Sequence, residues 1–127
     1  SFEIAFRRTS IQGKLQFNEL FGLGAPVLHC GEEEVFLHDA VKMGLKCVFS
    51  PAFVVTHNGA TTSVTRVGEP GTLKARGAYL YIAYPWTMIP RVFLISYRLH
   101  RDHGVPFFKA VRNMTAGIFY IMRKPLP

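Results

Sequence analysis

The sequence predicts an α/β fold in which helix exceeds strand. Residues 2–7 alternate with the two-residue period of a strand, and β-rich runs follow at 46–49 and 53–56. Beyond residue 70 the apolar residues recur instead at the spacing of amphipathic helices. We therefore expect a few short strands on the N-terminal side and a helix-rich C-terminal tail.

Helices are predicted over five stretches of the chain. A short helical turn at 16–22 is closed by Gly22, and a longer helix at 31–43 ends at Gly44. Three more helices are expected at 73–84, between Pro90 and Gly104, and from Pro106 onward. In the last of these, apolar residues follow a 4-3-4-3 spacing, at Phe107, Val111, Met114, Ile118 and Ile121.

Positive charge is concentrated in the second half of the chain. Residues 1–70 hold six Lys/Arg and seven Asp/Glu, a net of −1, whereas residues 71–127 hold nine Lys/Arg and one Asp, a net of +8. A basic and aromatic segment favours an anionic neighbour such as a membrane surface or a phosphate-bearing ligand. Because the cations alternate with large apolar residues at core spacing, and no nucleic-acid motif is present, we expect no binding to nucleic acid.

Two further features bear on location. Cys30 and Cys47 have no metal-ligand spacing and are interpreted as reduced thiols, which favours a cytoplasmic protein, including one at the inner face of the membrane. Residues 79–97 are mostly apolar but contain Arg91 and two prolines, which argues against a spanning helix. Packing against another domain, or lying on a membrane surface, is the expectation for this stretch.

The chemically informative residues are three acids that begin the helix at 31–43. Glu32, Glu33 and Glu34 fall in its first turn, where the helix dipole favours ionised carboxylates. A carboxylate held ionised in a pocket can accept a proton from a hydroxyl, which is general-base chemistry. Acids in a first turn are also common as simple capping residues, and periodicity alone favours that interpretation.

A resemblance to a known family gives these acids a role. Gly31 followed by two acids, a helix ending at Gly44, and a β run ending at His57 are similar to the Gly-Glu-Asp signature and strand-then-His element of family 2 glycosyltransferases. The resemblance is clear over residues 1–66 and covers 67–127 only as a helical tail. It implies the C-terminal half of a GT-A-type nucleotide-sugar transferase fold.

The resemblance also implies particular roles for residues. Glu33 matches the catalytic base and Glu32 the neighbouring acid that contacts the acceptor, while His57 matches the metal-binding His. A divalent metal, Mn²⁺ or Mg²⁺, would neutralise the leaving diphosphate. No Asp-x-Asp motif occurs in the chain, so we expect the metal site to be incomplete and the isolated fragment to be inactive. The loop at 58–76 is expected to fold over the diphosphate of the donor, through Thr62, Ser63, Arg66 and Arg76.

Two interpretations of function follow. In the first, residues 1–66 are the acceptor and catalytic-base half of a glycosyltransferase, and residues 67–127 are a loop and basic amphipathic tail. Its partners would be a nucleotide-sugar donor and a glycan or lipid-linked acceptor. In the second, the chain is a non-enzymatic basic module that docks on a membrane surface or a protein partner. Either way, exposed apolar surface favours a homo-oligomer.

Overall fold

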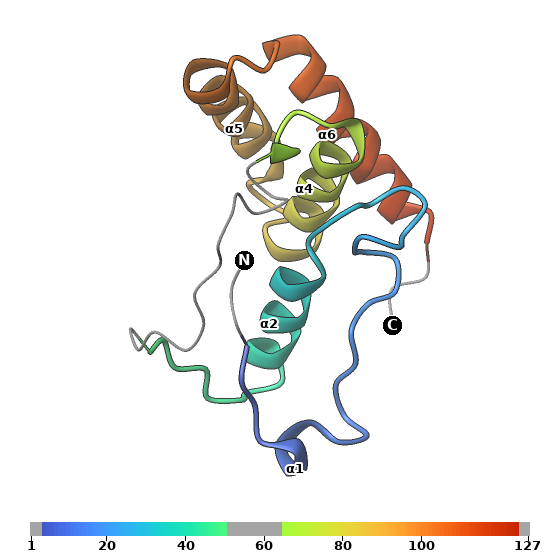
Figure 1. The fold of residues 1–127 in the computed structure, drawn as a ribbon, viewed down its shortest axis with the longest axis vertical. Coiled ribbons are helices and arrows are strands. Elements are labelled where there is room, and N and C mark those ends of the chain that lie inside the picture. Colours follow the sequence, from blue (N-terminus) through green and yellow to red (C-terminus); the bar gives the residue numbers. More distant parts are fainter. Residues whose placement is uncertain (1–3, 51–64, 125–127) are drawn as a thin grey trace.

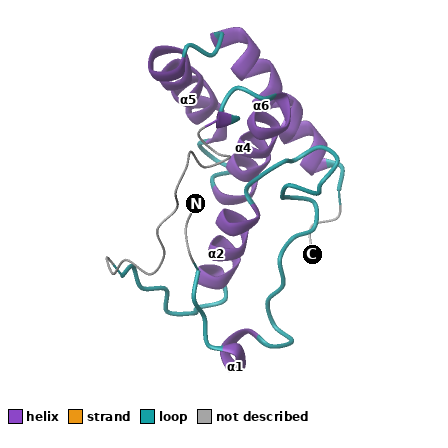
Figure 2. Cartoon of the chain, in the orientation of Figure 1, coloured by secondary structure: helices purple, strands orange, loops and turns teal. Residues whose placement is uncertain are grey.

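The computed structural model describes residues 4–50 and 65–124 and shows an all-helical arrangement over these ranges. Helix accounts for 58% of the described chain, and no strand occurs in it (Figure 2). Five helices are assigned: α1 (Arg8–Ile11), α2 (Glu32–Lys42), α4 (Pro70–Ala83), α5 (Met88–His103) and α6 (Phe107–Met122). None of these helices is long and apolar enough to cross a membrane, in agreement with the prediction for residues 79–97.

The predicted α/β class, and with it the GT-A-type half-fold, is therefore wrong. Residues 4–7 and 46–49 have the composition of strands but form no ladder, and the run at 53–56 lies outside the described residues. The β pairing that is present is one isolated bridge between Phe21 and Leu28. A strand needs neighbours for its backbone N–H and C=O groups, and the described part of the chain offers these runs none.

Helix α4 is the central element of the fold. It packs against α2 on one side and against α5 and α6 on the other, as Figure 1 shows. Its two faces serve two separate hydrophobic clusters. One joins α4 to the α5–α6 pair through Leu73, Leu80, Val92, Leu99, Val105, Ala110, Met114 and Ile118. The other joins α4 to α2, to the 21–28 segment and to the end of α6 through Phe21, Leu28, Val35, Ala75, Ala78 and Ile121.

Two glycines let α4 and α6 cross at very short distance. A Cβ added at Gly77 would lie 1.9 Å from the carbonyl oxygen of Met114, and one at Gly117 would lie 1.9 Å from that of Lys74. Met114 lies three residues before Gly117, and Lys74 lies three residues before Gly77. Each glycine therefore faces the backbone about one turn before the other glycine. The contact is reciprocal, and no side chain fits between the two backbones.

Residue spacing predicted four of the helices well. The core positions expected on α6, from Met114 to Ile121, are buried, and Gly44 and Gly104 follow α2 and α5 in the left-handed conformation that ends a helix. The short helix expected at 16–22 is absent, because the Asn18 side chain accepts a hydrogen bond from the Leu20 N–H at 3.0 Å and forms a turn there. The sequence did not predict α1.

Candidate functional site

The candidate site begins at the N-terminus of α2, where Glu32, Glu33 and Glu34 form the first turn as predicted. Gly31 precedes them with φ = 95°, a left-handed conformation that glycine adopts at little cost. The Val35 N–H donates to the Gly31 carbonyl at 3.0 Å and closes the turn. Three carboxylates therefore lie at the positive end of the helix dipole.

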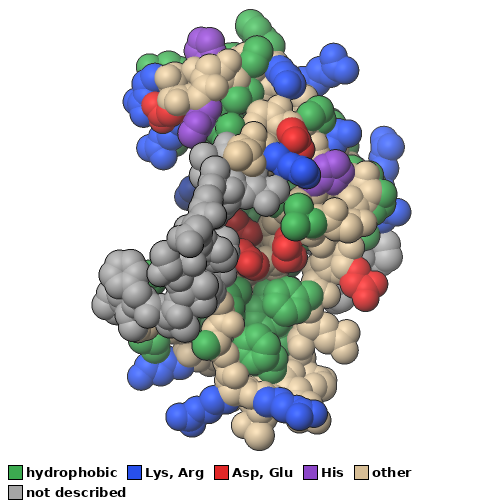
Figure 3. Space-filling view, viewed as in Figure 1, with side chains coloured by type: hydrophobic (Ala, Val, Ile, Leu, Met, Phe, Trp, Pro, Cys, Tyr) green, Lys and Arg blue, Asp and Glu red, His purple; other side chains and the backbone are tan. Residues whose placement is uncertain are grey.

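Glu32 is held against the loop before the helix. A Cβ added at Gly22 would lie 3.4 Å from the Glu32 carboxyl carbon, so the loop backbone runs directly beside this carboxylate. The loop is in turn fixed by the Gly22 N–H, which donates to the Leu28 carbonyl at 2.9 Å. Figure 3 shows acidic side chains gathered near the middle of this face of the molecule, where α2 begins.

Helix α4 supplies the second wall of the site. The His29 N–H donates to the Gly71 carbonyl at 3.4 Å, and the Cys30 Sγ lies 4.0 Å from the Thr72 carbonyl oxygen. A Cβ at Gly71 would lie 2.2 Å from the His29 ring, so this approach also requires a glycine. The first turn of α4 is thereby fixed next to the residue pair that leads into α2.

Arg76, predicted to contact the donor diphosphate from a loop at 58–76, lies instead within α4, because residues 70–76 are helical. Glu34, Arg76 and Glu32 all act electrostatically on the Cys30 thiol, so the guanidinium and both carboxylates lie in the neighbourhood of this thiol. Tyr79, half-buried on α4, is reached by Glu34 as well, and burial is the main cause that raises the pKa of its hydroxyl. The structure thus brings a cation and a phenol from α4 to the acids of α2.

Part of the wall formed by α4 was not predicted from the sequence. Thr72, Arg76 and Tyr79 are spaced at i, i+4 and i+7 and so share one face of α4. The sequence pattern predicts no site role for Thr72, Tyr79 or Cys30. Helical spacing around Arg76 was the signal that could have identified this face, but its contact with α2 is long-range and leaves no local pattern.

Burial beside two acids makes Cys30 a poorly reactive thiol. Loss of solvent, followed by repulsion from Glu34, raises its pKa from 9.0 to about 11. The pKa of Cys30 is higher in the folded state than in the unfolded state. The contribution of the neutral thiol to the free energy of unfolding is therefore complete below pH 9 and is lost as the pH rises through 11.

We expect a thiol reagent at pH 8 to modify the exposed Cys47 readily and Cys30 only slowly, with Cys30 becoming reactive near pH 11. Mass mapping of the modified peptides over time would check this, and equal rates at both cysteines would contradict the burial of Cys30.

Several other predicted site residues are not brought to the carboxylates. Arg66 lies just before α4 and forms a half-exposed ion pair with Glu69, with Nε 3.6 Å from Oε1. His57, Thr62 and Ser63 lie outside the described residues. Within 4–50 and 65–124, no group of three His, Cys, Asp or Glu side chains is arranged to hold a metal ion. The Mn²⁺ or Mg²⁺ site stays a prediction.

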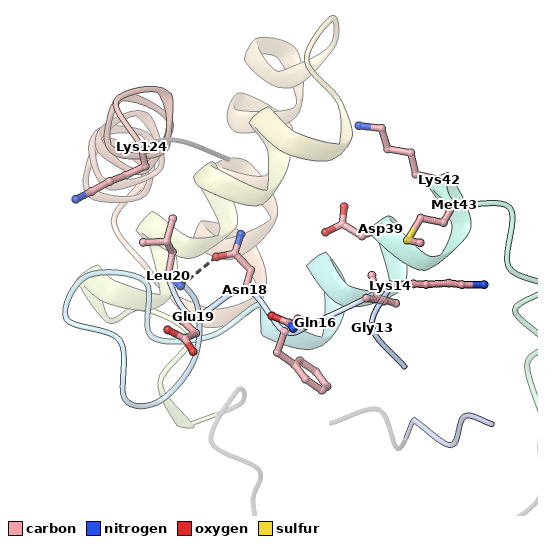
Figure 4. A pocket seen from close by; sticks show the side chains of 12 residues that line it. Gly13, Lys14, Gln16, Asn18, Glu19, Leu20, Asp39, Lys42, Met43 and Lys124 are labelled. Atoms are coloured by element: carbon pink, nitrogen blue, oxygen red, sulfur yellow. Dashed lines mark hydrogen bonds between the residues drawn. The ribbon is translucent and has the colours of Figure 1, made fainter. Parts of the chain in front are cut away.

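A separate groove of about 790 Å³ lies at the opposite end of α2 (Figure 4). Its walls are the 13–20 segment, the last turn of α2 with Asp39 and Lys42, and Lys124 beyond α6. None of the predicted site residues lines it. Phe17 lines the groove and stacks on Phe36 of α2, with ring centroids 4.4 Å apart. The groove therefore lies where the N-terminal segment packs on this helix.

The fold and the site together define a small helical protein with an acidic helix N-terminus facing a basic and aromatic helix. No family model, no curated protein and no solved structure matches this chain.

Proposed function

We propose that this chain carries the acceptor side of the active site of a family 2 glycosyltransferase. The observation that carries the proposal is that the first turn of α2 packs beside the first turn of α4, so that Glu32 and Glu34 of α2 and Arg76 of α4 all act electrostatically on the Cys30 thiol. A proton acceptor and a cation at one place are what displacement of a diphosphate by a hydroxyl requires. The proposal does not depend on the GT-A-type fold, which the helical structure contradicts.

In this reaction Glu33 takes the proton from an acceptor hydroxyl while the hydroxyl oxygen attacks the anomeric carbon of the donor sugar. The new C–O bond forms as the bond between that carbon and the nucleoside diphosphate breaks. The diphosphate leaves with the bonding electron pair, and its growing negative charge is stabilised by the Arg76 guanidinium. Glu32, fixed beside Gly22, is placed to orient the acceptor through its hydroxyls.

The family resemblance implies a divalent metal at the leaving group. The residues that the structure describes do not make such a site by themselves, so no step of the proposed reaction is assigned to it. The remaining donor-binding groups, including an Asp-x-Asp motif, would come from chain outside this sequence.

The experiment that tests the proposal is a titration of uridine and guanosine diphosphate, with and without Mn²⁺, followed by NMR. We expect chemical-shift changes centred on α4 near Arg76, and their loss in Arg76→Ala. The matched control is Arg98→Ala, which removes the same charge from the exposed surface of α5. His57→Ala, measured in parallel, tests the predicted metal ligand. Nucleotide binding that survives Arg76→Ala unchanged would place the diphosphate elsewhere and contradict the proposal.

A further inference from the structure

We propose that the α5–α6 end of the molecule docks, lying flat, on a membrane surface that contains anionic lipids. This inference rests on a surface separate from the carboxylate site and does not depend on the proposed function. We name the surface the aromatic ridge and define it as Ile89, Phe93 and Tyr97 of α5, together with Phe107 and Phe108 of α6.

The ridge is a second apolar face of α5. Val92, Ser96 and Leu99 form the first face and are buried in the bundle core. Ile89, Phe93 and Tyr97, spaced at i, i+4 and i+8, share another face and are each about half exposed, with Phe93 at 50%. A helix that packs in a bundle needs only one apolar face. The second apolar face of α5 can therefore contact an apolar medium outside the bundle.

Aromatic contacts continue this face onto α6. The ring of Phe93 lies 6.3 Å from that of Phe107, and Phe107 lies 5.5 Å from Phe108, measured between centroids. Phe108 is 82% exposed although it is one of the largest apolar side chains of the helix. Trp86, the single tryptophan of the chain, stands in the turn before α5 and is 96% exposed. Tryptophan, tyrosine and phenylalanine are the residues that anchor proteins at the membrane–water interface.

The charges around the ridge favour an anionic surface. Asp102 is the one acid after residue 70, and it is bound to Arg101 by two hydrogen bonds of 2.6 and 3.0 Å. Arg98, Lys109 and Arg112 form no ion pair with any described carboxylate. Figure 3 shows Lys and Arg side chains around the margins of the end formed by α5 and α6. Arg112 lies four residues after Phe108, on the same side of α6, as expected for a cation that reaches lipid phosphates while the phenyl ring enters the interface.

The composition favours a lipid surface over a second copy of the chain. A second copy would bring the same cations face to face, and Asp102, the one acid of this half, is already paired with Arg101. Anionic headgroups instead complement every cation at once and leave the aromatic rings in the interfacial layer. Since no described helix can cross a bilayer, the predicted binding mode is in the plane of the surface.

Vesicle binding by the intact chain tests this inference, with Trp86 as the internal reporter. Vesicles of phosphatidylcholine alone are compared with vesicles of equal parts phosphatidylcholine and phosphatidylglycerol. We expect co-sedimentation and a blue shift of Trp86 emission with the anionic vesicles only, both weakened by added salt. The double variant Phe93→Ser/Phe108→Ser should bind about tenfold more weakly or worse. Arg98→Glu/Arg112→Glu should also reduce binding.

Matched controls separate docking from general surface effects. Phe49→Ser removes another highly exposed phenylalanine, 84% exposed, from the segment after α2. Lys14→Glu/Lys42→Glu reverses two charges in the groove at the far end of α2. Both controls should bind vesicles as the wild type does, and all variants should retain the helical circular dichroism spectrum. Equal binding to both kinds of vesicle, or no vesicle-dependent change at Trp86, would overturn the inference. So would a blue shift that depends on protein concentration without lipid, which would assign the ridge to a second copy.

Discussion

Gly77→Ala and Gly117→Ala are each expected to lower the free energy of unfolding by about 3 kcal/mol, the upper end of the range for overpacked cores. The added Cβ would lie 1.9 Å from a backbone carbonyl oxygen, of Met114 in one case and Lys74 in the other. A backbone atom cannot rotate away as a side chain can, so α4 and α6 must separate. Every contact in the cluster that joins them would then loosen, including those of Leu73 and Met114.

Thermal unfolding followed by circular dichroism checks this expectation. A change of this size should lower the midpoint by more than 10 °C, at about 4 °C per kcal/mol for a chain of this length. Because both glycines belong to one crossing, the double variant should lose less than the sum of the two single losses. Gly24→Ala is the matched control, since nothing lies within 4 Å of its Cβ position and its backbone is not left-handed. Wild-type midpoints for both single variants would show that the helices do not cross here.

Under the proposed function, Glu33→Gln is expected to lower the rate of sugar transfer by about 10² to 10⁴, the range that general-base catalysis contributes. The amide keeps the size and polarity of the side chain but cannot accept the acceptor's proton. We therefore expect kcat to fall with little change in KM. The measurement is transfer of a radiolabelled sugar by an enzyme that combines this chain with its donor-binding part.

The control for this variant is Glu34→Gln. It controls for the loss of stability, since it removes the same charge from the same helical turn but leaves the proposed base Glu33 in place. If helix-dipole capping were the whole role of these acids, both variants would lose a little stability and no activity. Equal activity in Glu33→Gln and the wild type would therefore show that these acids only cap the helix.

The spacing of nearby residues predicted four of the helices and the three acids at the start of α2. Apolar spacing predicted α2, α4, α5 and α6 because each of these helices buries one face, and α2, α4 and α5 end just before a glycine or proline that the sequence reveals directly. The three acids could be placed in the first turn of α2 because that turn follows from the position of Gly31. These features depend on residues within a few positions of each other.

The strands predicted at residues 4–7 and 46–49 are absent because strand formation, unlike helix formation, depends on residues elsewhere in the chain. A strand is stabilised by hydrogen bonds to another strand, so a β-rich run specifies only a tendency. Helix-forming segments satisfy their own backbone groups and need no such partner. The change from an expected α/β fold to an all-helical one therefore depended on pairing that no local pattern encodes.

By itself the sequence determined the positions of four helices, the acidic first turn of α2 and the +8 charge of residues 71–127. Only the tertiary structure decided that Arg76 and Tyr79 lie near the acidic first turn of α2, since this depends on α4 approaching α2 where Gly71 admits the His29 ring. It also decided that Phe93 and Phe108 remain exposed, although their spacing suits a core equally well. Helical spacing defines which residues share a face, but whether that face is buried depends on what the rest of the chain packs against it.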